Sequence, residues 1–285
     1  MLLVFDIGNT NITVGMYEGD KLKRTYRLTT KMRRTSDEYG FMITDFLNDA
    51  NITSEDIEDV IIASVVPKVM HSFRNSIRKY LRKEPIIVGP GIKTGISVQM
   101  ENPKAVGADR IVDCAGAYYV YGGPALIVDF GTATTFDYID EKGVFSYGVI
   151  ALGVESGANA LWSQTAQLPE VEIKSPGTIL TKNTSANMQA GLFYGFLGQT
   201  EYIIRQFKKN WDGMTSRSLR PAAWERSSTA IHRSSTSMIA TSPSKGSRSS
   251  MSAIKKHSPI IKRPVFQPVF FLQIYCGFSF NIRRR

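Results

Sequence analysis

Cysteine is scarce in this sequence: Cys114 and Cys276 are the only two cysteines among 285 residues. They lie far apart in the chain and supply neither a disulfide framework nor a cysteine-ligated zinc site. The first apolar run ends at Asp6 with no basic leader before it, which is too early for a signal peptide. We therefore expect a cytoplasmic protein whose thiols stay reduced.

Uninterrupted hydrophobic runs of membrane-spanning length are missing as well. The best candidate, residues 265–282, is broken by Gln267, Pro268, Gln273 and Asn281. Hydrophobic residues nevertheless make up 42% of the chain and charged residues 21%, enough for one large core or two ordinary ones. The composition excludes a short peptide and a disordered chain.

Acidic residues are almost absent from the last quarter of the chain. Residues 211–285 hold 13 Lys and Arg but 2 Asp and Glu, whereas residues 1–210 hold 22 and 23. Serine shows the same break, with 15 in the last 75 residues and 11 in the first 210. The formal net charge of +10 therefore belongs to the tail, and two different sequences meet near Trp211.

The first 210 residues contain one motif twice. An apolar strand leads into the turn Asp6-Ile7-Gly8-Asn9-Thr10-Asn11 and a second β-rich stretch, residues 12–17. Another apolar strand, residues 125–128, leads into Asp129-Phe130-Gly131-Thr132-Ala133-Thr134-Thr135 and the stretch 136–140. The two copies start 123 residues apart, about the size of one domain, and predict two similar domains.

Helical and strand patterns alternate around these copies. We predict helices at residues 36–47, from about Ser54, and at 71–83, with buried strands at 60–66 and 85–88. Residues 188–208 carry apolar side chains at helical spacing and predict a long packed helix. This alternation is typical of the α/β class.

An Asp-x-Gly-x-Thr turn has the chemistry of a phosphate cradle. Glycine lets the backbone approach an anion, threonine adds a hydroxyl donor, and the N–H groups of the turn can point at one ligand. Aspartate can hold Mg²⁺ or its waters against phosphate oxygens. An ordinary hairpin turn uses the same residues, but two copies a domain apart favour two loops that face one nucleotide across a cleft.

A third segment, Gly107-Ala108-Asp109-Arg110, places a carboxylate next to a cation. Asp109 can act as a general base, and Arg110 can clamp an anion while it keeps Asp109 ionised. Taken alone, these residues are explained more simply by a surface ion pair or a helix N-terminus.

Together with Lys182-Asn183-Thr184, these motifs in this order and spacing resemble the type III pantothenate kinases over residues 1 to about 210. The resemblance implies the α/β architecture of acetate and sugar kinases, heat-shock 70 and actin. Two duplicated ribonuclease H-like domains, here 1–115 and 116–210, would have a nucleotide cleft between them. The resemblance further implies a cytoplasmic homodimer that phosphorylates pantothenate with ATP in the first step of coenzyme A synthesis. Its cofactors would be Mg²⁺ and a monovalent cation, K⁺ or NH₄⁺.

The resemblance also implies roles for single residues. Asp109 would be the catalytic base that takes the proton from the pantothenate hydroxyl. Asp129 would hold the monovalent cation, and Asp6 would lie near Mg²⁺ through phosphate or water. The ATP-binding residues would be Asp6, Ile7, Gly8, Asn9, Thr10, Asn11, Ile12, Thr13 and Thr132. The substrate-binding residues would be Met100, Gly107, Ala108, Asp109, Arg110 and Thr184.

Two positions depart from the family pattern. Met100 stands where relatives usually have a tyrosine close to the substrate, and the loss of one hydroxyl hydrogen bond weakens binding by about 1 kcal/mol. Residues 148–153 do not have the paired glycines and the proline of relatives. We expect this loop to be displaced.

Residues 211–285 do not continue the family pattern, but a shifted reading frame does. When the last base of each codon is read with the first two of the next, Ser218 to Trp224 can encode Val-Ile-Ala-Thr-Gly-Gly-Leu. In the same frame, Thr236 to Ser250 can encode Asp-Ile-Tyr-Asp-Arg-Tyr-Leu-Thr-Leu-Lys-Gly-Leu-Gln-Val-Ile. These contain the Ala-Thr-Gly-Gly and Leu-Thr-Leu-x-Gly-Leu of the family. We infer a frameshift between about Lys208 and Ser216, so that residues 211–285 form an aberrant tail and the second domain is incomplete.

Three other functions fit parts of the sequence. A non-catalytic nucleotide-binding regulator needs the phosphate turns but not Asp109, and a sugar or acetate kinase does not need the segment from Gly107 to Arg110. A nucleic-acid arm would account for Lys255-Lys256 and residues 283–285, but no recognition motif accompanies them. The full set of motifs favours the pantothenate kinase.

Overall fold

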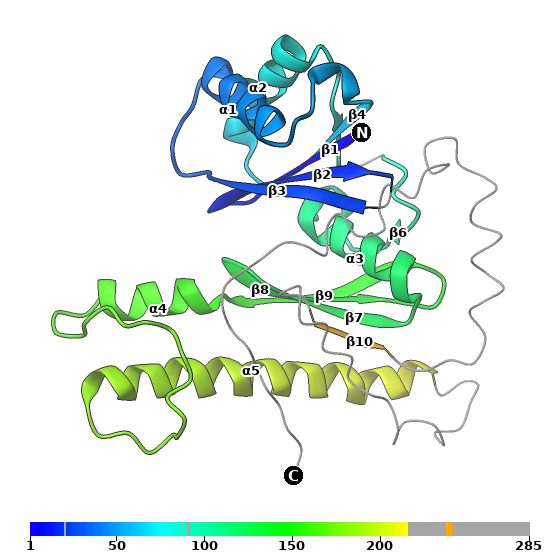
Figure 1. Ribbon diagram of the computed structural model, residues 1–285. Helices are drawn as coiled ribbons and strands as arrows, with labels where there is room; N and C mark the ends of the chain where they lie inside the picture. Colours follow the sequence, from blue (N-terminus) through cyan, green and yellow to red (C-terminus); the bar gives the residue numbers. More distant parts are fainter. Residues whose placement is uncertain (20, 90–91, 216–237, 242–285) are drawn as a thin grey trace. The chain divides into compact units, whose positions relative to one another are not determined.

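The computed structural model describes residues 1–19, 21–89, 92–215 and 238–241 (Figure 1). The chain divides into two compact units. Among the described residues, unit 1 contains 1–125 and 138–147, and unit 2 contains 126–137, 148–215 and 238–241. Most of the tail, including Ser218 to Trp224 and Lys255-Lys256, lies outside the described residues.

The first sheet belongs to unit 1 and has the strand order β3-β2-β1-β4-β5. Its strands are β1 (Leu2–Ile7), β2 (Asn11–Glu18), β3 (Lys21–Thr29), β4 (Asp59–Ser64) and β5 (Ile86–Ile87). β1, β2 and β3 form an antiparallel meander, and β4 returns parallel to β1. This order, with one parallel strand beside the first strand of a meander, is that of a ribonuclease H-like domain.

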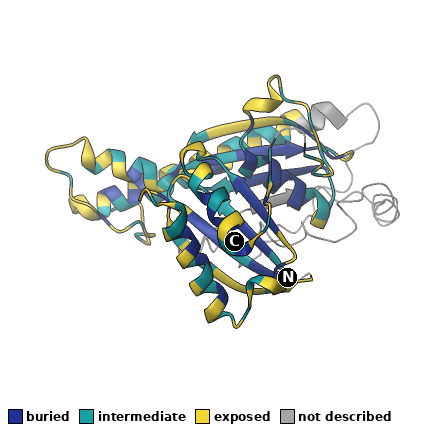
Figure 2. Cartoon of the chain, turned by 90° about the horizontal axis from the view of Figure 1, so that it is seen from above, coloured by how far each residue is buried: buried dark blue, intermediate teal, exposed yellow. Residues whose placement is uncertain are grey.

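Two helices cover one face of this sheet and a third helix covers the other (Figure 1). α1 (Ser36–Asp49) and α2 (Pro67–Ser76) pack through Tyr39, Ile43 and Phe73 on the main core cluster. α3 (Ala108–Tyr121) packs through Ala108 and Val112 on the opposite face. The side chains of each strand alternate between these two faces. Most residues of β1, β2 and β4 are buried, whereas β3 has no buried residue (Figure 2).

The helix predicted from Ser54 is wrong: the structure has only a 3-10 turn, η1 (Ser54–Asp56). This turn is capped, because the Asp56 carboxylate accepts from the N–H of Thr53 at 2.8 Å. A cap stabilises the first turn of a helix but does not extend it. Here the helix cannot continue, because strand β4 begins at Asp59. The helix predicted at 36–47 is confirmed as α1, with a capping box between Thr35 and Glu38.

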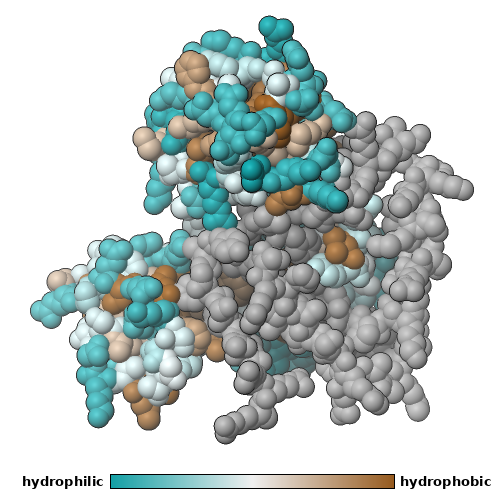
Figure 3. All heavy atoms as spheres, in the orientation of Figure 1, coloured by the Kyte–Doolittle hydropathy of each residue, from teal (hydrophilic) through white to brown (hydrophobic). Residues whose placement is uncertain are grey.

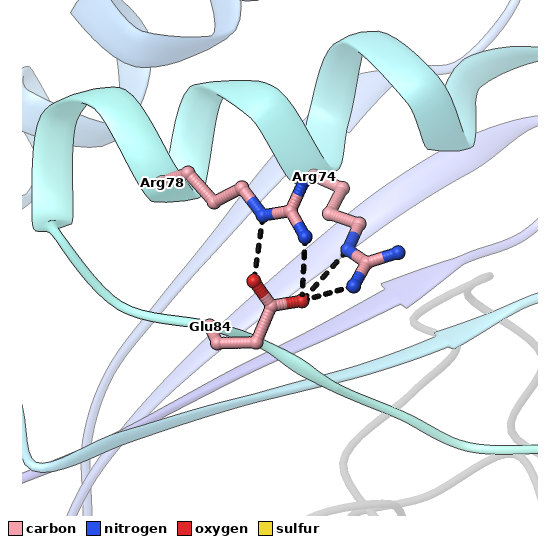
Figure 4. A network of polar contacts seen from close by, with 3 residues as sticks. All are labelled: Arg74, Arg78 and Glu84. Carbon is pink, nitrogen blue, oxygen red and sulfur yellow. Dashed lines mark hydrogen bonds and ion pairs between the residues drawn. The ribbon is translucent and has the colours of Figure 1, made fainter.

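The helix predicted at residues 71–83 begins earlier, at Pro67, which suits the first turn because it has no N–H to satisfy. α2 passes into a π-helical turn, η2 (Ile77–Leu81). Its exposed side carries Arg74 and Arg78, whose guanidinium groups both bind the carboxylate of Glu84 (Figure 4). Figure 3 shows mainly hydrophilic residues over α1 and α2.

The second sheet has the order β10-β7-β8-β9-β6. Its strands are β6 (Ser97–Val98), β7 (Ala125–Phe130), β8 (Ala133–Ile139), β9 (Val144–Leu152) and β10 (Met238–Thr241). β7, β8 and β9 follow one another as β1, β2 and β3 do. β10, which lies within the tail that the sequence predicts to be aberrant, is beside β7 as β4 is beside β1. The predicted duplication of two ribonuclease H-like domains in an α/β fold is therefore confirmed, while the predicted boundaries at residues 115 and 210 stay predictions.

Helices of unit 2 follow the second sheet. α4 (Val154–Ser163) and α5 (Thr184–Thr215) pack together through a small cluster that includes Ala158, Met188 and Leu192. The long helix predicted at 188–208 is confirmed and is longer at both ends. No described helix is long and apolar enough to cross a membrane. Short elements η3 (Pro103–Ala105) and the linking segment 164–183 complete the described chain.

Candidate active site

The first predicted phosphate turn joins β1 to β2. Its backbone closes tightly, because the N–H of Gly8 donates to the carbonyl oxygen of Asn11 at 3.0 Å. Ile7 and Ile12 flank the turn and are fully buried, so that they anchor it to the core. Asn9 and Asn11 are exposed at its tip. This short hairpin with an exposed tip fits both a phosphate cradle and an ordinary turn.

The segment from Gly107 to Arg110 forms the N-terminus of α3, a helix that the sequence pattern did not predict. Gly107 is the N-cap residue and Asp109 lies in the first turn. The N–H groups at a helix N-terminus attract negative charge. One of them, from Arg110, donates to Oδ1 of Asp109 at 2.8 Å. The helix-terminus interpretation is therefore correct, and it is compatible with an anion site.

Gly107 has a steric role beside Asp109. A Cβ at residue 107 would overlap Oδ1 of Asp109 and would lie 3.6 Å from Cγ1 of Val65. The Asp109 carboxylate thus folds back over the glycine. Val65 also donates its N–H to the carbonyl oxygen of Ile7 at 3.1 Å. Within unit 1, Val65 therefore links the start of the phosphate turn to the N-terminus of α3.

Burial raises the pKa of Asp109 above its usual value, and the N–H and the charge of Arg110 partly oppose that rise. Arg110 therefore does not by itself keep Asp109 ionised, as the sequence suggested, since burial has the larger effect. The guanidinium of Arg110 lies 5.5 Å from the ring centroid of Phe145, a residue that pairs with Val98 of β6. Met100 follows β6 and is half-buried.

The second predicted phosphate turn, in unit 2, joins β7 to β8. The N–H of Gly131 donates to the carbonyl oxygen of Ala133 at 3.0 Å. Asp129 ends the buried part of β7 and is half-buried, while Thr132 is exposed at the tip of the turn. The Oγ of Ser156 in α4 donates to the carbonyl oxygen of Thr132 at 2.7 Å. Sequence reasoning missed this support.

Gly153 packs directly on this second turn. Residues 144–152 are strand β9 and Gly153 is the N-cap of α4, so the prediction of a loop at 148–153 is wrong. A strand forms here because β9 pairs with β8. The difference from the glycine pattern of relatives did not indicate this pairing. A Cβ at residue 153 would overlap the carbonyl oxygens of Gly131 and Thr132. Only glycine lets α4 begin this close to the turn.

We expect Gly153→Ala to move the second turn. Because φ is −75° at Gly153, alanine fits the local backbone and the effect is purely steric. We expect a loss of about 1–3 kcal/mol in the free energy of unfolding, with weaker nucleotide binding, measured by urea unfolding and by ATP titration. Gly191→Ala in α5 is the control, since no atom of the described residues beyond the adjacent helical backbone lies within 4 Å of that Cβ position. Equal stability of the two variants would contradict the steric role of Gly153.

Thr184 begins α5, and Asn183 caps the helix by accepting the N–H of Ala186 at 2.9 Å. The Lys182-Asn183-Thr184 motif is thus a helix N-cap with Thr184 exposed. The structure brings Asp6 to Thr13 together with Gly107 to Arg110 in unit 1, and it places Asp129, Thr132 and Thr184 in unit 2. Asp137 of β8 is a buried acidic residue, with 1% exposure. The sequence analysis did not single it out, although an acidic residue within an apolar strand can be recognised from the sequence.

Known proteins of one family match most of this chain. The family model described as type III pantothenate kinase matches residues 2–206. A type III pantothenate kinase of Bifidobacterium longum is 58% identical over 213 residues, which cover 75% of this chain and 83% of the relative.

Two further relatives carry the same name. The protein of Agathobacter rectalis is 54% identical over 209 residues, covering 73% of this chain and 80% of the relative. That of Listeria monocytogenes is 50% identical, with 73% and 81% covered. The matched residues include both phosphate turns and the N-terminus of α3. The chain therefore belongs to the type III pantothenate kinase family.

Proposed function

We propose that this chain transfers the γ-phosphoryl group of ATP to pantothenate, giving 4'-phosphopantothenate in the first step of coenzyme A synthesis. The observation that supports this most is the intact segment from Gly107 to Arg110, held at the start of α3 and linked through Val65 to the first phosphate turn. A regulator that only binds nucleotide has no need of a buried carboxylate there. The alternative of a regulator is therefore the weaker one.

In this proposal, Asp109 accepts the proton of the pantothenate hydroxyl as its oxygen attacks the γ-phosphorus. The bond from that oxygen to phosphorus forms, the bond from phosphorus to the β-γ bridging oxygen breaks, and ADP leaves. Phosphoryl transfer depends mainly on positioning and on charge neutralisation. Residues 6–13 would cradle the ATP phosphates, and Thr132 would also bind ATP. Pantothenate would be contacted by Met100, Gly107, Ala108, Arg110 and Thr184.

Asp6 and Asp129 are suited to cations that also bind the phosphate oxygens of the nucleotide. The described residues include no group of three or more His, Cys, Asp or Glu side chains able to hold a metal ion. Single carboxylates at the ends of β1 and β7, Asp6 and Asp129, suit ions whose other ligands are phosphate oxygens and water. Asp6 would lie near Mg²⁺ through phosphate or water, and Asp129 would hold the K⁺ or NH₄⁺ ion. The Mg²⁺ would neutralise charge on the phosphates. We further propose a cytoplasmic homodimer.

The acid limb of the pH profile reports the pKa of Asp109. Because burial raises that pKa, we expect kcat/KM to fall on acidification with a midpoint above about 3.9, the ordinary value for aspartate. A raised carboxyl pKa also means that Asp109 contributes stability below its unfolded pKa and loses it as pH rises through the folded value. A midpoint at or below 3.9 would contradict the burial of the base.

A substrate panel tests the proposed function. We expect the purified chain to form ADP from ATP when pantothenate is added, and not when glucose or acetate replaces it. Turnover of glucose or acetate alone would assign a sugar or acetate kinase. Nucleotide binding without turnover of any of these would favour the regulator.

A further inference from the structure

The first phosphate turn carries no positive charge of its own. Residues 6–13 include one aspartate and no lysine or arginine. Triphosphates are normally met by at least one arginine or lysine as well as by backbone N–H groups and a metal ion. Arg110 is occupied with the substrate in the proposed function. A cation for the phosphates must therefore come from another part of the fold.

The strand register places one such residue in line with the turn. Asp6 of β1 lies opposite Thr13 of β2, and Thr13 lies opposite Arg27 of β3. Residues opposite each other on neighbouring antiparallel strands project to the same face. Neighbouring strands are about 4.8 Å apart, so the backbone of Arg27, two strands away, lies about 10 Å from the backbone of Asp6. A long arginine side chain can cover that distance across Thr13, which is 8% exposed.

The face on which this row lies is the face of α3. The neighbours of Thr13 along β2, Ile12 and Val14, belong to the core under α1 and α2. Tyr26 and Leu28, on either side of Arg27, pack against the same core. By alternation, Thr13 and Arg27 project to the opposite face, where Val4, Ala63 and Ala108 form the cluster beneath the start of α3. That is the side on which Asp109 lies.

We propose that Arg27 binds the phosphate chain of ATP as part of the first phosphate turn. Its guanidinium would bridge two phosphate oxygens bidentately, which a lysine cannot do. The proposal rests on the proposed function, since it needs ATP at residues 6–13. Arg27 is an exposed residue of β3.

A matched control is available on the same strand. Arg24 is also exposed and lies opposite Met16, which is buried in the core under α1 and α2. Arg24 therefore projects to the face opposite that of Arg27. Arg24→Gln and Arg27→Gln remove the same charge from the same strand, so they differ in the face of the sheet and not in net charge.

The experiment measures equilibrium binding of ATP and of adenosine to the full chain with Mg²⁺ present. We expect Arg27→Gln to weaken ATP binding tenfold or more and to change adenosine binding less than twofold, since only ATP carries phosphates. Arg27→Lys should fall between the wild type and Arg27→Gln. Arg24→Gln should bind ATP as the wild type does, and the effect of Arg27→Gln should shrink as salt is raised.

The outcomes distinguish a failure of the role proposed for Arg27 from a failure of the proposed pantothenate kinase function. If the wild-type chain binds no ATP, the proposed function fails and the role of Arg27 fails with it. If the wild type binds ATP and Arg27→Gln binds it equally well, only the role of Arg27 is overturned. A parallel loss of ATP and adenosine binding with a lower Tm would also overturn it, because Arg27 would then stabilise the fold and not the phosphates.

Discussion

Replacing Asp109 with asparagine is expected to lower kcat about a thousandfold and to leave the Kd for ATP within about twofold. A positioned general base contributes about 10²–10⁴ to a rate, and asparagine keeps the shape of the side chain without its basicity. The amide can still accept the N–H of Arg110 that Asp109 accepts at 2.8 Å, so the start of α3 should stay in place. Steady-state kinetics and ATP titration measure the two quantities.

Asp45→Asn is the control for Asp109→Asn. Asp45 is exposed on α1, so this substitution makes the same change of charge at a position outside α3. Its kcat should equal that of the wild type. If Asp109→Asn retained more than a tenth of wild-type turnover, Asp109 would not be the base. An equal loss of turnover and of ATP affinity would point to a disturbed site and not to lost proton transfer.

Restoring the family reading frame is expected to have the second large effect. The unit 2 surface exposes large hydrophobic residues: Ile150 at 63% and Leu152 at 53% on β9, and Leu180 at 83% before α5. Ile150 and Leu152 project to the same face of β9, and contiguous exposed apolar surface marks a missing partner or an aggregation site. We expect one base inserted between codons 208 and 216 to yield a chain with a higher Tm, less binding of a hydrophobic dye and at least tenfold higher turnover.

The control for the restored frame is a chain that stops after residue 210. If the inferred frameshift is correct, this shorter chain and the 285-residue chain should have similar turnover, because neither carries the family ending. A 285-residue chain as active and as stable as the restored one would show that its own tail completes unit 2. Sequencing of the gene across codons 200–260 would show independently whether a base is missing.

Local patterns predicted the parts of the fold that local physics decides. The turns at Asp6 and Asp129, the helix α1 and the long helix α5 all follow from residue type and spacing. The helix expected from Ser54 failed because a cap is necessary but not sufficient. The strand at residues 148–152 was missed although Val149 and Ile150 favour strands, and it pairs with β8 in the second sheet.

The candidate site could be predicted only in part for the same reason. The segment from Gly107 to Arg110 could be interpreted from the sequence as a general base beside an anion-binding arginine. Burial raises the pKa of Asp109 and Arg110 lowers it, and this balance depends on tertiary packing. Gly153 is separated by more than twenty residues from the turn it touches. Arg27 joins the row of Asp6 only through the register of three strands, which no local pattern reveals.

The most direct test of the pantothenate kinase assignment is detection of its product. The frame-restored chain, incubated with ATP, Mg²⁺, K⁺ and pantothenate, is analysed by mass spectrometry beside an Asp109→Asn blank. We expect 4'-phosphopantothenate and ADP in equal amounts, with almost none in the blank. ATP binding without any phosphopantothenate, or ADP formation that does not depend on pantothenate, would contradict the assignment.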